Sequence, residues 1–160
     1  RITIAMSVSL VNKVIIKDWI DYNGHMNLSY YILVFDMGAE VILSKFKMGE
    51  QSAKTTKRST MVVETHTNYI KEVKENDEVI IYLSHVDHDK KRLHYKLEMY
   101  EKSKHILSAT TEVLALYMNL DERKVTEFEK DKIKIMENFI DKNKNGFDNK
   151  NLRFLSKLKK

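Results

Sequence analysis

Residues 21–46 read DYNGHMNLSYYILVFDMGAEVILSKF, and this stretch decides the fold. The apolar residues recur at steps of three and four, so the pattern predicts a helix over residues 28–46. Asn27, a residue type that often caps helices, stands at its start. Asp36 and Glu40 are the only charged residues in its middle. A helix this apolar is usually covered by other structure, so we expect it to be buried.

The segments on both sides of this helix have the composition of β-strands. One strand is predicted before the turn, over Val11–Trp19. A polar connection at residues 50–58 is followed by four segments rich in Val, Ile, Thr and Tyr, with short polar turns between them. These are Thr60–Val73, Glu78–His88, Arg92–Glu101 and Ile106–Asn119. We therefore predict an α+β fold in which a curved antiparallel sheet wraps around a long central helix.

The C-terminal part of the chain differs from the rest. Residues 129–140 predict a second, amphipathic helix, and a segment rich in Lys and Asn follows it. Apolar residues between positions 152 and 158 predict a short helix that docks on the domain itself. We expect one main domain over residues 1–128, followed by a helix and basic tail over residues 129–160.

Composition and charge exclude several classes of function. The chain has 160 residues, the usual length of one domain. It has no cysteine, which excludes cysteine nucleophiles, thiolate metal ligands and disulfides. Residues 1–128 hold 18 Lys or Arg and 18 Asp or Glu, so the net charge of +5 comes wholly from residues 129–160. The main domain is therefore not built for binding nucleic acid, and the basic tail is expected to be solvated.

The location expected from the sequence is the cytoplasm. The first ten residues lack the long apolar stretch and cleavage site of a signal peptide. Apolar runs elsewhere are far shorter than the roughly 20 residues that span a membrane. We therefore expect no membrane association.

The turn before the helix carries the residues suited to chemistry. A helix start presents unpaired N–H groups and a partial positive charge, which stabilise an anion or an oxyanion. Asp21 brings a carboxylate close to this point, and His25 titrates near neutral pH. Gly24 allows a sharp turn. These are components of acyl transfer, although an Asp before a helix is also a common cap or turn residue.

The turn and two later segments resemble a known family. Residues 19–31, reading WIDYNGHMNLSYY, resemble the signature of hotdog-fold acyl-CoA thioesterases of the hydroxybenzoyl-CoA thioesterase-like group. The form DYNGHMN with the paired tyrosines is most similar to thioesterases that act on betainyl-CoA in the carnitine pathway. Residues 62–73 and 91–99 resemble two strands of the same family. The resemblance covers roughly residues 10–128.

The resemblance implies a function and roles for the residues of the turn. It implies hydrolysis of an acyl-CoA thioester, with a short or polar acyl group, to a free acid and CoA. Asp21 matches the catalytic carboxylate, acting as nucleophile or as general base. Leu28, with Asn27 as a second candidate, matches the backbone N–H donors that polarise the thioester carbonyl, within the motif that includes Gly24. His25 is expected to orient Asp21 or the loop, or to contact substrate.

Residues outside the turn give further candidates. Glu64 is a candidate second carboxylate, since Val62, Glu64, His66 and Asn68 share a face in one strand register, although an exposed strand face is the simpler interpretation. The basic run Lys90, Lys91 and Arg92 is a candidate contact for CoA phosphates, or else a solvated turn. Aromatic residues near the turn are core residues or a cage for a quaternary ammonium group; they are Trp19, Tyr22, Tyr30 and Tyr31.

Cofactors, partners and a competing function complete the prediction. No metal site is expected, and CoA enters as part of the substrate instead of as a cofactor. Proteins of this family are at least dimers, so we predict a homodimer or homotetramer with the site between subunits. The alternative function is a hotdog protein that binds acyl-CoA as a regulator without hydrolysing it.

Overall fold

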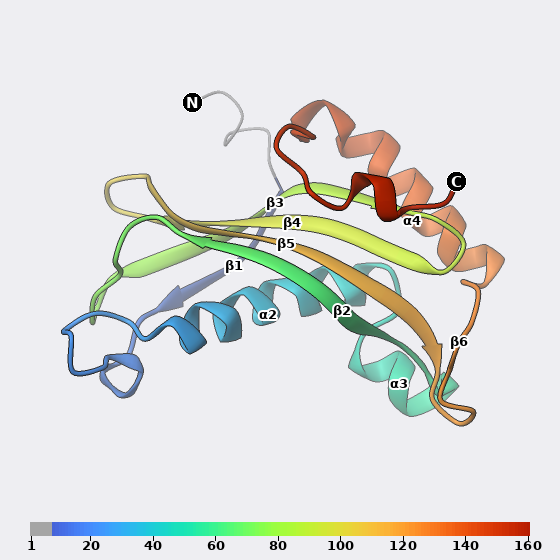
Figure 1. Cartoon of the computed structure of the whole chain (residues 1–160), viewed down its shortest axis with the longest axis horizontal. Coiled ribbons are helices and arrows are strands. Elements are labelled where there is room, and N and C mark those ends of the chain that lie inside the picture. The colour runs from blue at the N-terminus through green and yellow to red at the C-terminus, as the bar shows by residue number, and fades with distance from the viewer. Residues whose placement is uncertain (1–7) are drawn as a thin grey trace.

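The computed structural model describes residues 8–160, and its centre is a long helix against a curved sheet (Figure 1). The sheet has the strand order β1-β3-β4-β5-β2, and all of these neighbours are antiparallel. The strands are β1 (Val8–Val14), β2 (Arg58–Tyr69), β3 (Glu78–His88), β4 (Arg92–Glu101), β5 (Ile106–Asn119) and the short β6 (Lys124–Val125), which pairs with β5. The predicted α+β architecture is confirmed.

Helix α2 (Leu28–Lys45) lies on one face of the sheet, which we call the inner face. Its buried side recurs at steps of three and four; the buried residues are Tyr31, Val34, Phe35, Gly38, Ala39 and Ile42. Gly38 allows a close approach, because a Cβ there would lie 2.8 Å from Cγ2 of Ile81 in β3. The predicted helix over residues 28–46 is confirmed to within one residue.

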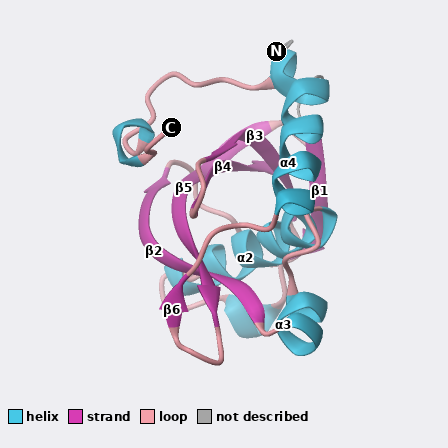
Figure 2. Cartoon of the chain, turned by 90° about the vertical axis from the view of Figure 1, so that its right-hand side faces the viewer, coloured by secondary structure: helices cyan, strands magenta, loops and turns pink. Residues whose placement is uncertain are grey.

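The remaining helices are α3 (Glu50–Thr56), α4 (Lys130–Asn143) and the 3-10 turns η1 (Lys17–Trp19), η2 (Lys144–Gly146) and η3 (Leu155–Lys157). Helix α4 and the C-terminal segment lie on the other side of the sheet from α2, the outer face (Figures 1 and 2). Docking of this segment on the domain is confirmed. The boundary at residue 128 stays a prediction.

Three local expectations were wrong. The first strand ends at Val14, and residues 17–19 form a 3-10 turn instead of its continuation. Residues 50–56, for which only a polar connection and no helix was predicted, are helical, with Glu50 and Lys54 paired at 3.2 Å across one turn. The tail forms only a three-residue 3-10 turn at Leu155–Lys157 instead of a helix. The expectation about a signal peptide falls mostly outside the described residues.

Two buried carboxylates attach the tail to the outer face. Glu112 of β5 accepts hydrogen bonds from the N–H groups of Arg153 (2.7 Å) and Phe154 (2.8 Å), and its Oε2 lies 2.7 Å from Nε2 of His94. Burial opposes ionisation of Glu112, but these bonds outweigh it, so its pKa lies below the usual value. Asp89 likewise accepts from the N–H of Lys159 (2.8 Å).

Candidate active site

The turn between β1 and α2 is closed by its own backbone. The N–H of Asp21 donates to the carbonyl of His25 (3.1 Å), and the N–H of Gly24 donates to the carbonyl of Asp21 (3.0 Å). Gly24 has φ of +82°, a conformation that costs glycine little and other residues more. The glycine of the motif is therefore required by the turn, and its role is to shape the backbone around Asp21.

Asp21 is held in its ionised form by two donors. Its Oδ1 accepts the N–H of Asn23 at 2.8 Å, and its Oδ2 accepts the side-chain amide of Asn27 at 3.1 Å. These bonds, the Asn23 N–H first, and to a lesser degree the charge of His25, hold the pKa of Asp21 below its usual value. The carboxylate is thus charged and oriented before any substrate arrives.

Asn27 joins the turn to the helix. Its Oδ1 accepts the N–H of Ser29 at 3.0 Å, which caps α2, while its amide holds Asp21. Its own N–H donates to the carbonyl of Trp19 at 2.9 Å. The N–H of Asn27 is therefore occupied and is a poor candidate for an oxyanion donor. The role of Asn27 in this structure is to position Asp21 and the first turn of α2.

Leu28 is the first residue of α2, and its N–H has no hydrogen-bond partner within residues 8–160. Free N–H groups at a helix start bind negative charge, and the helix dipole adds to that preference. The Leu28 side chain is 61% exposed. A free donor therefore stands at the exposed end of α2, beside the carboxylate of Asp21.

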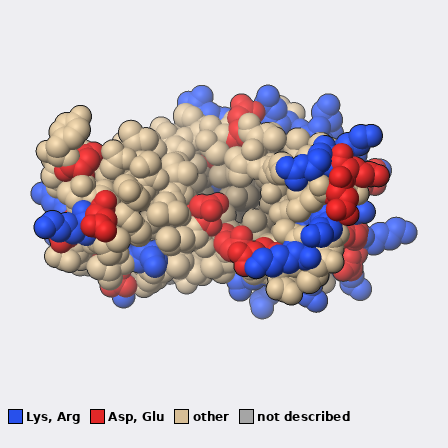
Figure 3. All heavy atoms as spheres, turned by 90° about the horizontal axis from the view of Figure 1, so that it is seen from below, with Lys and Arg blue, Asp and Glu red and all other residues tan. Residues whose placement is uncertain are grey.

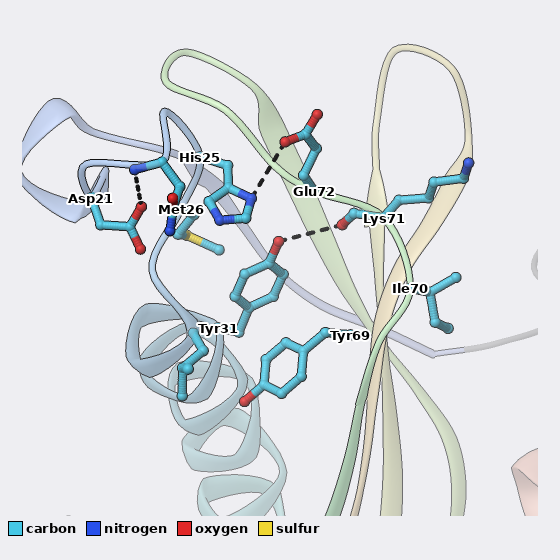
Figure 4. Close-up of a pocket in the computed structure, with 10 residues that line it drawn as sticks. Asp21, His25, Met26, Tyr31, Tyr69, Ile70, Lys71 and Glu72 are labelled. Atoms are coloured by element: carbon cyan, nitrogen blue, oxygen red, sulfur yellow. Dashed lines mark hydrogen bonds and ion pairs between the residues drawn. The ribbon is translucent and has the colours of Figure 1, made fainter.

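A cavity of about 380 Å³ opens beside this turn (Figure 4). We call it the turn cavity; its lining comprises Asp21, Asn23, His25, Met26, Leu28, Tyr31 and residues 69–72. Asp21 and Leu28 both line it, and the Asp21 carboxylate is bonded to the N-cap residue of α2, so both residues border one space at the helix start. A thioester placed here can meet an anionic base or nucleophile and a free N–H donor together.

His25 faces the segment after β2, not the carboxylate of Asp21 (Figure 4). Its Nδ1 lies 3.3 Å from Oε1 of Glu72. The Tyr31 hydroxyl ties the same segment to α2, donating to the carbonyl of Lys71 (3.3 Å) and accepting the N–H of Val73 (3.1 Å). These contacts fix the wall formed by residues 69–72, which the sequence predicted as part of a strand and not as part of the site.

Glu64 lies on the opposite face of the sheet. A bulge between Val62 and Glu64 breaks the alternation of β2, so the two residues do not share a face as the sequence suggested. Val62 lines a cavity next to α2, whereas Glu64 lies 3.7 Å from Nζ of Lys157 in the C-terminal segment. Within one protomer, the structure does not bring Glu64 together with Asp21.

The basic run lies at the far end of the strands. Arg92 begins β4 and pairs with Leu116, whereas the turn cavity adjoins Tyr69, which pairs with Ala109 at the other end of β5. Lys90 and Lys91 are exposed, while Arg92 is bound to Asp89 at 2.9 Å. Within one protomer these residues are a strand length away from Asp21.

The aromatic residues near the turn do not form a cage in this chain. Trp19 and Tyr30 stack on each other with ring centroids 5.5 Å apart, and Tyr22 is 97% exposed. The turn cavity is instead lined by Tyr31 and by Tyr69 of β2, whose rings meet edge to face at 5.1 Å.

Two further observations on residues 8–160 concern membrane spans and metal sites. No helix within residues 8–160 is long and apolar enough to cross a membrane. Over the same residues, no three His, Cys, Asp or Glu side chains are grouped so as to hold a metal ion.

Comparisons with known proteins identify the family of the chain. A family model described as the thioesterase-like superfamily matches residues 16–139. The betainyl-CoA thioesterase of Pseudomonas aeruginosa is 30% identical over 115 residues, which are 72% of this chain and 72% of that protein.

Solved structures agree on the fold. A Staphylococcus aureus protein in complex with CoA has a TM-score of 0.78 and 22% identity, covering 86% of each chain. The DHNA-CoA thioesterase of the same species has a TM-score of 0.77 and 17% identity, covering 88% of this chain and 95% of that one. Together with the family match, these findings show that the chain belongs to the thioesterase-like superfamily and is a thioesterase of the hotdog fold.

Proposed function

We propose that the protein hydrolyses an acyl-CoA thioester to a carboxylic acid and CoA in the turn cavity. The observation that carries this proposal is that ionised Asp21 and the free N–H of Leu28 line the same cavity. The relative from Pseudomonas aeruginosa makes betainyl-CoA the first substrate to test. Release of free CoA thiol across short, branched, aromatic and betainyl esters tests the activity. Saturable binding of every ester without thiol release would support a non-catalytic regulator instead.

The chemistry follows from the charges. As the carbonyl carbon becomes tetrahedral, negative charge grows on its oxygen, and the Leu28 N–H donates to it more strongly than to the ground state. Asp21 either takes the proton of an attacking water or attacks the carbon itself. The C–S bond then breaks, and the CoA sulfur takes up a proton that comes from the water. If Asp21 is the base, it passes on the proton it removed. If Asp21 is the nucleophile, the acyl group first remains on it as an anhydride, and a water molecule then hydrolyses this anhydride to the free acid and restores Asp21. In either case Asp21 must be ionised.

The pH dependence of hydrolysis follows from the lowered pKa of Asp21. The ionised form of Asp21 is the active one. As pH falls, kcat/KM should therefore stay constant until the pH is below the usual pKa of an aspartate. Asn27→Ser keeps a good N-cap but removes the amide that donates to Asp21. The pKa of Asp21 should rise, so the acidic limb of the pH–rate profile should move to higher pH.

The control for this experiment lies in the same turn. Tyr22→Phe alters an almost fully exposed side chain and should leave the acidic limb in place. An acidic limb that stays where it was in Asn27→Ser would show that Asp21 is not the group titrating.

We also propose that the active protein is a homodimer joined along β2. This strand is at the end of the sheet order, and an unpaired, apolar edge strand favours pairing with another strand. Exposed apolar side chains line it and the segment that follows; they are Met61, Val62, Val63, Tyr69 and Ile70. The outer face is already covered by α4 and the C-terminal segment, which favours a dimer over a tetramer stacked through that face.

In the proposed dimer, the basic run Lys90–Arg92 of one protomer lies near the turn cavity of the other. A two-fold axis through β2 pairs it antiparallel with its copy. The Lys90–Arg92 end of one protomer then comes to the same end of the joint sheet as Asp21 of the other. CoA phosphates bound at one turn cavity can therefore meet Lys90 and Lys91 of the partner, through charge attraction.

Changing one residue of β2 should separate the protomers. Val63→Lys places a charge on the apolar edge and should shift the protein toward monomer in light scattering, with loss of thioesterase activity. Val14→Lys is the matched control, because both valines are 53% exposed and Val14 lies on the other edge strand, β1. A wild-type monomer with full activity would contradict the proposed dimer.

A further inference from the structure

A second cavity, of about 290 Å³, lies next to the turn cavity along α2. We call it the helix–strand cavity; its lining includes Ile32, Phe35, Asp36, Thr65, Tyr95 and Thr111. Ile32 is one helical turn beyond Leu28, and Thr65 precedes Tyr69 by four residues on β2. The two cavities therefore follow each other between the same helix and the same strand.

This arrangement determines the direction in which the acyl group of a bound thioester would extend. A thioester carbonyl at the N–H of Leu28 has the helix–strand cavity beside it, along the side of α2. From Leu28 to Asp36 the helix rises about 12 Å, and helical side chains lean toward the N-terminus, which shortens the span to the Asp36 carboxylate. The acyl group thus extends along α2 toward the side on which Asp36 lies, while the sulfur and CoA remain at the turn.

Within residues 8–160, Asp36 supplies the only formal charge in the lining of this cavity. No Lys, Arg or His is among the described residues that line it. Asp36 is exposed, and it forms no hydrogen bond or ion pair with another residue in the range 8–160. From the side on which α2 lies, the molecule is hollowed near its middle, with both acidic and basic side chains around the hollow (Figure 3).

Tyr95 of β4 also lines this cavity. Its side chain is 3% exposed, and burial first, then the charges of Asp36 and Glu40, raise its pKa. A phenol that stays neutral offers an aromatic ring without adding charge. An aromatic ring and an unpaired carboxylate in one cavity are features that favour a cation.

Resting on the proposed function, we propose that the helix–strand cavity receives the acyl group and that Asp36 makes it selective for an acyl group carrying a positive charge. Quaternary ammonium groups fit this description, because they are apolar in shape yet charged. They can lie against apolar walls while their charge interacts with Asp36. Asp36 thereby becomes the specificity-determining residue, distinct from Asp21, which acts on the thioester itself.

Two CoA esters of the same shape test the charge alone. Betainyl-CoA carries a trimethylammonium group, and 3,3-dimethylbutanoyl-CoA carries a tert-butyl group in the same position. Wild-type protein should have the higher kcat/KM for betainyl-CoA. Asp36→Asn, which keeps the side-chain shape, should reduce the ratio of the two kcat/KM values by about 2- to 5-fold, the range expected for an exposed carboxylate whose attraction for a cation is screened by solvent. The change should appear mainly in KM for betainyl-CoA, because Asp36 attracts ground state and transition state alike.

The control removes a carboxylate from the other side of the sheet. Asp141→Asn on α4 makes the same change in net charge, and its carboxylate is exposed and paired with Lys144. It should leave the ratio as in wild type, and circular dichroism should show both variants folded.

The possible failures are distinguishable. An unchanged ratio in Asp36→Asn, or a wild type that hydrolyses the two esters equally, would overturn the role of Asp36. Thiol release from other acyl-CoA esters, but not from betainyl-CoA, would overturn the proposed preference for a cationic acyl group. The proposed thioesterase function would still hold. No thiol release from any ester would overturn both.

Discussion

Asp21→Asn should lower kcat for thioester hydrolysis by about 10²- to 10⁴-fold, the range expected for loss of a catalytic base. Asparagine keeps the shape of the side chain and can still accept the N–H of Asn23 through its carbonyl oxygen. It cannot take a proton from water or attack a carbonyl. The loss should therefore appear in kcat with the fold intact, measured by thiol release and by thermal unfolding of the variant.

Asp18→Asn is the matched control. Asp18 is an exposed carboxylate three residues earlier, in η1, and its replacement makes the same change in charge. It should hydrolyse the substrate at a rate close to wild type. Near-normal turnover in Asp21→Asn would exclude Asp21 as the catalytic group and would turn attention to the other carboxylate of the turn cavity, Glu72.

Leu28→Pro should lower kcat by about 10²- to 10³-fold, because proline removes the backbone N–H assigned to the oxyanion. The first position of a helix is where proline is best tolerated. The preceding residue, Asn27, has φ of −65° and ψ of 145°, the extended conformation that a residue before proline prefers. The substitution therefore deletes one donor without breaking α2.

Leu28→Ala distinguishes the effect of the Leu28 N–H donor from the effect of the Leu28 side chain. Alanine keeps the N–H and loses the exposed leucine side chain, so kcat should stay within a few-fold of wild type. Equal losses in the two variants would mean that the side chain of Leu28 matters and its N–H does not.

Much of the fold could be predicted because its patterns are local. Helix α2 is marked by a cap residue and a continuous apolar stripe, and the bounds predicted for β3, β4 and β5 match those observed. These strands alternate with short polar turns that have few conformations. The prediction failed at α3 because a polar seven-residue segment carries no apolar periodicity.

The candidate site could be predicted only where it is continuous in sequence. Asp21, Asn27 and Leu28 are close together in the chain, so the motif identified them. The wall formed by Lys71 and Glu72 comes from the end of β2, and nothing in its composition indicates that it folds back against His25.

The prediction for Glu64 shows where the alternation of side chains along a strand fails to predict which face a residue occupies. Its assignment to the same face as Val62 assumed a regular strand, and a single bulge reverses the outcome. The attachment of the tail was hidden for a similar reason. Glu112 lies 41 residues before Arg153, and the bond between them joins a side chain to a backbone N–H, which leaves no pattern in the sequence.

The most direct test of the central claim is a crystal structure of Asp21→Asn with uncleaved betainyl-CoA. We expect the thioester carbonyl oxygen at about 3 Å from the N of Leu28, with the carbonyl carbon facing residue 21 directly or through one water. A thioester bound away from the start of α2, with residue 21 turned to solvent, would contradict the account.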